Sequence, residues 1–410
     1  MTLAVFDRLR QHADYTHKYN RGTGRHGWLR LTPAYSVRIV EELIGGEKGP
    51  QRVFDPFCGT ATTALSAACY GHESVTTDIN PFLVWLGRAK TAHYNAATIT
   101  RSGHACSDVI SLMKSKKIRA NTAPPIHNIE RWWSPTALNF LCHLQAAIDI
   151  VVPSETQEGT LLRVAFCRTL IGCSNAAFNH QSMSFRDNSQ PEIKDQMDLV
   201  NTFKEDVGLI LSGAVENPIG NASVLLHDAR ELSKLTMEKF NLVVTSPPYA
   251  NRMSYVRELR PYMYWLGFLI NGRDAGELDW LTIGGTWGIA TSRLNDWKPE
   301  AGHCLFGELE KTLASISQPD NPNGYVLAAY IRKYCVDMEK HFAELRTVLA
   351  PRAQVHYIVG NSTFYGQLLS VEKIYAHIMH DVGFKDINIR PIRKRNSKKE
   401  LIEFDVSARF

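Results

Sequence analysis

The stretch that decides the fold reads Arg52-Val53-Phe54-Asp55-Pro56-Phe57-Cys58-Gly59-Thr60-Ala61-Thr62-Thr63. Its first residues predict a short buried strand that ends at Asp55, and the Ala- and Leu-rich residues 62–70 predict a helix. A second strand is predicted over 73–77, with Asp78 at its end. A strand, a glycine-containing turn, a helix and a strand ending in an acid form the opening half of a nucleotide-binding α/β unit.

The α/β pattern extends on both sides of this unit. A helix is predicted over 36–43, and further strands over 224–226 and 241–244. Later segments predict helices over 255–269, 325–349 and 370–382, and strands over 354–359, 386–392 and 401–408. The sequence therefore predicts a mostly parallel sheet with helices on both faces and an antiparallel C-terminal hairpin at its edge.

Segments of other character interrupt or flank this pattern. The helical spacing over 130–172 indicates a mainly helical insertion between the second and third strands. We predict an N-terminal basic arm (1–30), an α/β domain built from 31–92 and 221–410, the helical insertion (93–220), and an irregular Trp- and Gly-rich subregion (271–322).

Composition excludes several classes of protein. The chain has 410 residues, 44% of them apolar, and no apolar run long enough to span a membrane or to form a signal segment, so we expect a cytoplasmic protein. The eight cysteines form no Cys-x-x-Cys pair and no zinc spacing. We expect neither a metal nor a disulfide. The net charge of +5 is compatible with a polyanionic partner without requiring one.

The turn after the first strand has the chemistry of a small-molecule site. Backbone N–H groups and a helix N-terminus lie close together there, and Gly59 permits close approach of a ligand. Three threonines, Thr60, Thr62 and Thr63, supply hydroxyl groups. With one glycine and a leading acid, this turn suits an ammonium group better than a pyrophosphate.

A second candidate site is Thr245-Ser246-Pro247-Pro248-Tyr249, directly after the strand predicted over 241–244. Two prolines fix the backbone and remove two N–H donors, which leaves carbonyls and the Ser246 hydroxyl as acceptors. An exocyclic amino group donates two hydrogen bonds, which Ser246 Oγ and the Pro247 carbonyl match. On its own, the stretch is equally compatible with a simple Pro-Pro turn and a buried tyrosine.

Taken together, the two stretches resemble motifs I and IV of the amino-group DNA methyltransferases. The usual form of motif I is Asp-Pro-Phe-x-Gly-Ser-Gly-Thr-Thr, and Ala61 stands where the family commonly has glycine, a departure expected to tighten the turn. The resemblance covers 31–91 and 222–269, and implies a Rossmann-like class I methyltransferase fold with S-adenosylmethionine as cofactor. Serine in the first catalytic place is most frequent in cytosine-N4 enzymes, and Asp or Asn in adenine-N6 enzymes.

The resemblance also implies roles for individual residues. Asp55 and Gly59 would line the methionine part of the cofactor, Asp78 would accept the ribose hydroxyls, and Asp228 the adenine amino group. Leu31-Thr32-Pro33-Ala34-Tyr35 resembles motif X, although a turn before a helix explains it equally well. The implied cofactor residues are Asp55, Pro56, Phe57, Gly59, Thr60, Thr62, Thr63, Asp78, Ile79, Asn80, Asp228, Ala229, Thr32 and Pro33; the implied catalytic residues are Thr245, Ser246, Pro247, Pro248 and Tyr249.

Recognition of DNA is expected to come from outside this core. Candidates are the helical insertion with its 175–186 loop, and the tryptophans Trp280, Trp287 and Trp297. The predicted phosphate contacts are Asn251, Arg252, Arg257, Arg260, Arg393, Lys394 and Arg395. The tryptophans are equally compatible with a core role, and the arginines with pairing to acids or exposure to solvent.

The expected function is therefore transfer of a methyl group to N4 of a cytosine rotated out of double-stranded DNA, with Tyr249 stacking on the base. A cognate restriction endonuclease is a possible functional partner, and the sequence leaves the oligomeric state open. The alternatives are adenine-N6 methylation, methylation of an RNA base amino group, and a catalytically silent nucleic-acid-binding module.

Overall fold

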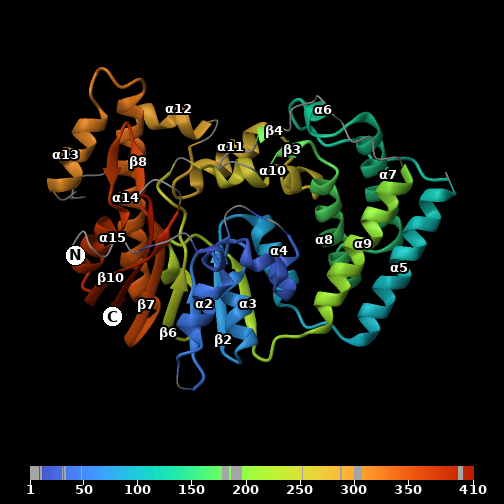
Figure 1. Ribbon diagram of the computed structural model, residues 1–410, viewed down its shortest axis with the longest axis horizontal. Coiled ribbons are helices and arrows are strands. Elements are labelled where there is room, and N and C mark those ends of the chain that lie inside the picture. Colours follow the sequence, from blue (N-terminus) through green and yellow to red (C-terminus); the bar gives the residue numbers. More distant parts are fainter. Residues whose placement is uncertain are drawn as a thin grey trace.

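A seven-stranded sheet organises the protein (Figure 1). The structure, a computed structural model, describes residues 9, 12–29, 31, 34–47, 49–115, 117–177, 184–185, 196–251, 253–286, 289–299, 307–395 and 400–410. The sheet has the order β10-β11-β7-β6-β1-β2-β5. The strands are β1 (Arg52–Asp55), β2 (Glu73–Asp78), β5 (Ala222–Leu226), β6 (Phe240–Thr245), β7 (Leu349–Gly360), β10 (Lys385–Lys394) and β11 (Ile402–Arg409).

The strand order reverses at β1. From β1 the chain moves outward through β2 to β5, then returns to the other side of β1 through β6 and β7, all of them parallel. Only β11 runs against its neighbours, and it lies between β7 and the outermost strand β10. This is the Rossmann-like topology of the class I methyltransferase fold, as the sequence predicted. The predicted edge hairpin is present, with its antiparallel strand on the inner side.

Alternation along the strands builds two apolar layers. On one face, Val53, Leu242 and Ile358 pack against α2 (Val37–Ile44) and α3 (Thr62–Cys69). On the other face, Phe54, Val243 and Tyr357 pack against α14 (Gly324–Leu345) and α15 (Val371–Asp381). With both faces buried, functional groups are confined to the ends of the strands.

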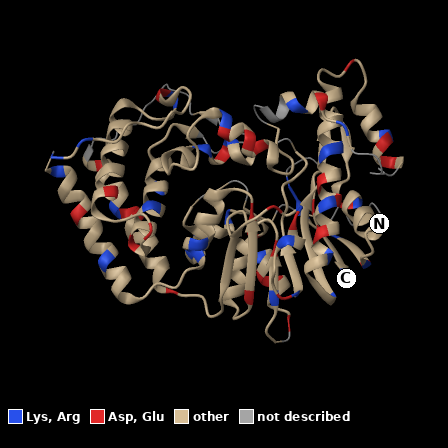
Figure 2. Cartoon of the chain, turned by 180° about the vertical axis from the view of Figure 1, so that it is seen from behind, with Lys and Arg blue, Asp and Glu red and all other residues tan. Residues whose placement is uncertain are grey.

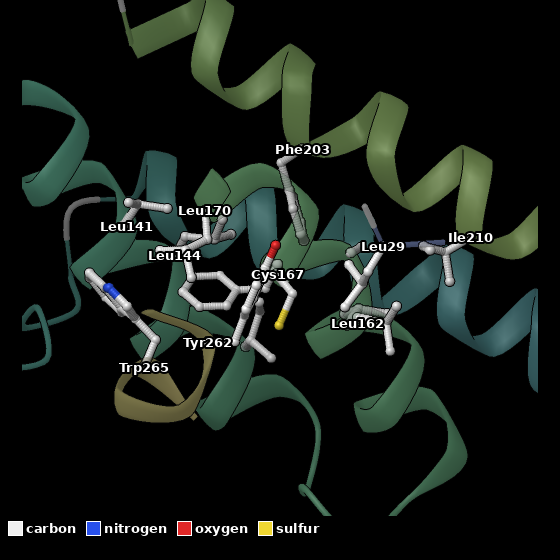
Figure 3. Close-up of a cluster of buried hydrophobic side chains, with 14 of the residues drawn as sticks. Leu29, Leu141, Leu144, Leu162, Cys167, Leu170, Phe203, Ile210, Tyr262 and Trp265 are labelled. Atoms are coloured by element: carbon white, nitrogen blue, oxygen red, sulfur yellow. The ribbon is translucent and has the colours of Figure 1, made fainter. Parts of the chain in front are cut away.

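A helical segment occupies most of 93–220 and packs beside the sheet domain. Its helices are α5 (Ala96–Lys114), α6 (Ile129–Trp132), α7 (Pro135–Val151), α8 (Gln157–Gly172) and α9 (Gln196–Val215), with a short hairpin of β3 (Ala176–Ala177) and β4 (Ser184–Phe185). Its core also takes in residues of α4 (Pro81–Thr91) and α10 (Tyr255–Trp265). In Figure 3, Tyr262 and Trp265 of α10 lie among the leucines of α7 and α8. The segment is thus anchored on the helix that follows the 245–249 loop.

The prediction of an irregular segment over 271–322 is wrong. It contains α11 (Gly272–Leu281), α12 (Ile289–Asp296) and α13 (Gly307–Ile316). Asn271 begins α11 with a capping box, since its side chain accepts from the backbone of Asp274 and the Asp274 side chain bonds back to the backbone of Asn271. A further hairpin of β8 (Ser362–Phe364) and β9 (Gln367–Leu369) was also missed.

The described part of the predicted N-terminal arm is packed against the protein. It contains three 3₁₀ helices, η1 (Ala13–Tyr15), η2 (Tyr19–Gly22) and η3 (Gly24–Gly27); two more are η4 (Leu232–Lys234) and η5 (Arg346–Val348). Arg25 is buried and donates to the carbonyls of Lys90, Gly213 and Ala214 at 3.0 Å. Those carbonyls close the ends of α4 and α9, so Arg25 joins the helical segment to the sheet domain.

Charged residues of both signs lie on the described part of the chain (Figure 2). In the view of Figure 2, basic and acidic residues are interspersed over the helices and the sheet. Among the described helices, none is both long and apolar enough to cross a membrane. Likewise, the described residues contain no group of three or more metal-binding side chains.

Candidate active site

One cavity, of about 280 Å³, opens where the sheet order reverses. It brings together predicted residues that are far apart in the sequence. Those that line it are Pro56, Phe57, Gly59, Asp78, Ile79, Asn80, Asp228, Ala229, Ser246, Pro247, Pro248, Tyr249, Asn251, Arg393 and Arg395. A crevice at this point of an open α/β sheet is the usual ligand site of such folds.

The turn between β1 and α3 has a left-handed backbone at two positions. Gly59 has φ 49° and Ala61 φ 58°, the second being a conformation that glycine adopts at lower cost. The threonines of the turn are buried, and their hydroxyl groups bond to other groups of the protein. Thr60 and Thr62 bond to each other at 2.9 Å, and Thr63 donates to the carbonyl of Val244 at 2.9 Å.

Asp78, at the end of β2, organises the wall of the cavity. Gly59 N donates to one carboxylate oxygen and Asn80 N to the other, each at 2.9 Å. Burial raises the pKa of Asp78 to about 6. Each oxygen of a carboxylate has a second acceptor position, so Asp78 keeps acceptor capacity while it fixes the loops beside it.

Asp228 follows β5 and is held by Arg230. The Arg230 guanidinium bonds to Asp228 Oδ2 at 2.7 Å and to Asp337 of α14 at 3.0 Å. Burial acts to raise the pKa of Asp228, but the ion pair with Arg230 holds it below the usual range. The cavity therefore has a charged acceptor at this strand end. No local pattern indicates Asp337, which lies on α14, 107 residues after Arg230.

Asp55 lies behind the cavity wall. It is fully buried, accepts from Thr245 Oγ1 at 2.6 Å and from Phe57 N at 3.0 Å, and thereby ties the end of β1 to the end of β6. Its other oxygen is buried and has no hydrogen-bond partner among the described residues. Burial raises the pKa of Asp55 to about 7.

This raised pKa predicts a pH-dependent stability. A carboxyl group that binds its proton more tightly in the folded state contributes stability that is lost as pH rises from about 4 to about 7. We expect the Asp55→Asn variant to gain stability relative to the parent protein over that range, by up to about 4 kcal/mol. Urea unfolding of both proteins at pH 5 and pH 8 measures the difference. An unchanged difference between the two pH values would show that Asp55 ionises normally.

The loop of residues 245–249, predicted to be catalytic, presents a fixed hydroxyl. Ser246 Oγ donates to the carbonyl of Ile358 on β7 at 3.0 Å. Its proton is therefore directed at the protein, which leaves the oxygen lone pairs as acceptors. The Pro248 carbonyl accepts a hydrogen bond from the Tyr334 hydroxyl at 2.9 Å. Tyr334 belongs to α14, on the face of the sheet opposite to α2 and α3, so this bond holds the prolines in place from that face.

Tyr249 is held by residues from the β10–β11 hairpin. Its hydroxyl donates to Glu403 Oε1 at 2.8 Å, and the guanidinium carbon of Arg395 lies 5.0 Å from its ring centroid. Arg393 pairs with the same Glu403 at 2.7 Å. Glu403 was not predicted, because an acid in a C-terminal strand has no local link to a loop 154 residues earlier.

Other predicted DNA contacts lie elsewhere. Arg260 is half-buried against the helical segment, with its guanidinium carbon 5.3 Å from the ring centroid of Trp132. Arg257 is half-buried on the same helix, and Lys394 ends β10 outside the cavity lining. Trp280 is half-buried and packs against the core of the sheet domain, with Lys333 Nζ 4.8 Å from its ring centroid. Thr32, Pro33, Arg252, Trp287 and most of the 175–186 loop lie outside the described residues.

Several cavity residues were not anticipated. Tyr15, Thr16 and His17 line it from the N-terminal segment, and Met253, Leu281 and Thr282 from the region after the 245–249 loop. Beneath the first turn, Lys90 is fully buried and donates to the Thr60 carbonyl at 3.0 Å. Burial lowers the pKa of Lys90 to about 8.

Comparison with known proteins shows similarity over most of the chain. It is 21% identical to the Type II methyltransferase M.BsoBI of Geobacillus stearothermophilus, over 94% of this chain and 84% of that protein. It is 22% identical to M.MvaI of Kocuria varians, over 81% of this chain and 75% of the relative. It is 22% identical to the Type II methyltransferase M.AvaI of Nostoc sp., over 96% of this chain and 88% of that protein.

Other comparisons add little. No protein-family model matches the chain. Among solved structures, the rRNA methyltransferase aviRa from Streptomyces viridochromogenes has 9% sequence identity and a TM-score of 0.29, over 93% of this chain and 87% of that one, and this likeness is too weak to carry an argument.

Proposed function

We propose that the chain is an S-adenosylmethionine-dependent DNA methyltransferase whose target is the N4 amino group of a cytosine in duplex DNA. The observation that carries the proposal is that two strand-end carboxylates, Asp78 and Asp228, line the same cavity as the Ser246 loop. The similarity to Type II methyltransferases over most of the chain supports it.

The acceptors of the cavity fit the cofactor. A nucleoside with two ribose hydroxyls and an adenine amino group requires acceptors at two places, which Asp78 and Asp228 supply at the ends of adjacent strands. Gly59, also in the cavity wall, lets the backbone approach closely. When bound, S-adenosylmethionine supplies an electrophilic methyl group for the amino nitrogen.

The catalytic loop acts by orienting the amino group. Ser246 Oγ and the Pro247 carbonyl accept its two hydrogens, which localises and directs the nitrogen lone pair. The hydrogen bond to Ile358 prevents Ser246 from donating to the amino nitrogen and competing for that lone pair. The contribution is one of position and electrostatics, with no covalent bond to the protein. Tyr249 offers a ring face to a base rotated out of the duplex.

Recognition of the DNA sequence is proposed for the helical segment, with residues 271–322 as a second candidate. The segment shares its core with α10, which follows the catalytic loop directly. Asn251 and Arg252 are proposed to hold phosphates beside the target base. Lys394, at the β10–β11 hairpin, is proposed to hold a further phosphate. The designation of the relatives as Type II supports a role in restriction–modification alongside a cognate endonuclease.

The modified base tests the proposal. We expect purified protein and labelled S-adenosylmethionine to transfer methyl groups to duplex DNA and not to RNA. Mass spectrometry of the digested nucleosides should then find N4-methylcytosine. N6-methyladenine in its place would overturn the cytosine assignment, and absence of transfer to any nucleic acid would overturn the proposed function.

A further inference from the structure

The β10–β11 hairpin brings two guanidinium groups into the cavity, and the protein uses more of the donors of one than of the other. Arg393 Nε and Nη2 both bond to Glu403, and its Nη1 lies 3.4 Å from the carbonyl of Lys394. Arg395 Nη1 donates to the carbonyl of Asn361 at 2.7 Å, which uses one of the five N–H groups of a guanidinium. Among the described residues, no second hydrogen-bond acceptor engages the Arg395 guanidinium, so Arg395 is a cavity cation that still offers several donors.

Arg395 is fixed close to the catalytic loop. A Cβ atom at position 360 would lie 2.5 Å from Arg395 Nη1 and 2.9 Å from Tyr249 Cε2, so the backbone of Gly360 allows the guanidinium and the ring to come together. Asn361 in turn accepts from Ile402 N at 2.9 Å and holds the start of β11. Tyr249 cannot rotate freely because Glu403 holds its hydroxyl.

The edges of the two candidate bases differ beside the amino group. In cytosine, the amino donor is followed by two acceptors, N3 and O2. In adenine, it is followed by one acceptor, N1, and then by a C–H group. A planar fork of N–H donors matches two adjacent acceptors, which is the geometry that makes arginine selective in base recognition. A cavity with amino-group acceptors at Ser246 and a donor fork at Arg395 is complementary to the cytosine edge.

We propose that Arg395 is the residue that selects cytosine, by donating hydrogen bonds to N3 and O2 of the base while the catalytic loop holds N4. This inference rests on the proposed function. A cation at N3 opposes the positive charge that develops on the base as N4 attacks. Arg395 therefore contributes to KM rather than to kcat.

The experiment compares two duplexes that carry the recognised sequence, one with cytosine at the target position and one with 3-deazacytosine, which lacks the N3 acceptor. We expect the parent protein to lose about tenfold or more in kcat/KM on the deaza duplex. The Arg395→Met variant should lose a similar factor on the cytosine duplex, mostly in KM, and should no longer distinguish the two. Arg395→Lys, which keeps the charge and loses the fork, should show the same lack of discrimination.

Controls separate this role from general effects. Lys385→Met removes a positive charge from the exposed start of the same strand and should preserve discrimination. Thermal melting and S-adenosylhomocysteine binding report whether each variant is folded. If Arg395→Met lost the same factor in kcat/KM, relative to the parent protein, on both duplexes, Arg395 would act in phosphate binding or folding, and the inference would be overturned. A parent protein that is indifferent to the deaza substitution would overturn it as well, whatever the variants do. In either case the methyl transfer itself would stand.

Discussion

Turnover of the Ser246→Ala variant is expected to fall about 100-fold or more, with cofactor binding unchanged. The substitution removes one of the two acceptors proposed for the target amino group and leaves the Pro247 carbonyl alone. It also removes the hydrogen bond to the Ile358 carbonyl. Because Ile358 lies on β7, away from the residues proposed for the cofactor, this loss should not affect cofactor binding. Single-turnover methyl transfer measures the first effect, and calorimetry with S-adenosylhomocysteine the second.

A serine outside the cavity gives the matched control. Ser107→Ala removes an exposed hydroxyl from α5 that, among the described residues, bonds to the carbonyl of Gly103 in the same helix, and should leave turnover unchanged. If Ser246→Ala transfers methyl groups at the parent rate, Ser246 does not orient the amino group and the mechanism proposed above is wrong.

Asp78→Ala is expected to weaken cofactor binding by about 100-fold or more, since hydrogen bonds to a charged acceptor are among the stronger ones. The substitution removes the proposed ribose acceptor. It also releases the N–H groups of Gly59 and Asn80, which the carboxylate holds in place. Titration calorimetry with S-adenosylmethionine gives the affinity directly.

The pKa of Asp78 adds a second readout. Because that pKa is about 6, the affinity of the parent protein should be constant above pH 7 and fall as pH drops below 6, where the carboxyl becomes protonated and accepts less well. Asp78→Asn should be weak throughout and lack this pH dependence. Glu73→Ala, at the exposed start of the same strand, should bind as the parent does. A pH-independent affinity in the parent would show that Asp78 does not contact the cofactor.

What the sequence predicted well is local in the chain. Strand, turn and helix around Asp55 follow one another directly, so hydrophobic spacing and a single glycine suffice to place them. The helices over 271–322 were missed because they have only eight to ten residues each, and helices of that length depend on caps and tertiary contacts. In α11, two Gly and two Asp residues also lower the helix propensity.

The rest of the site was beyond sequence reasoning because it is assembled across the fold. Arg395 and Glu403 reach Tyr249 only because β11 inserts between β7 and β10. Arg25, within the predicted N-terminal basic arm, is buried. The sequence could not show this, because no pattern in a single segment reveals that two distant helices end at the same point. The positions of the basic residues along the sequence do not show which arginines face the cavity and which join helices.

The shared core at α10 restricts how this protein could acquire new targets. Tyr262 and Trp265 belong to the interior of the helical segment, although the chain reaches them only after the catalytic loop. Transplanting residues 96–215 from a relative would set these rings against a surface shaped for other side chains. Under the proposed function, the segment is therefore not an interchangeable cassette. Its specificity would diverge by substitutions on its outer faces, and engineered chimeras would have to carry α10 across together with the helices.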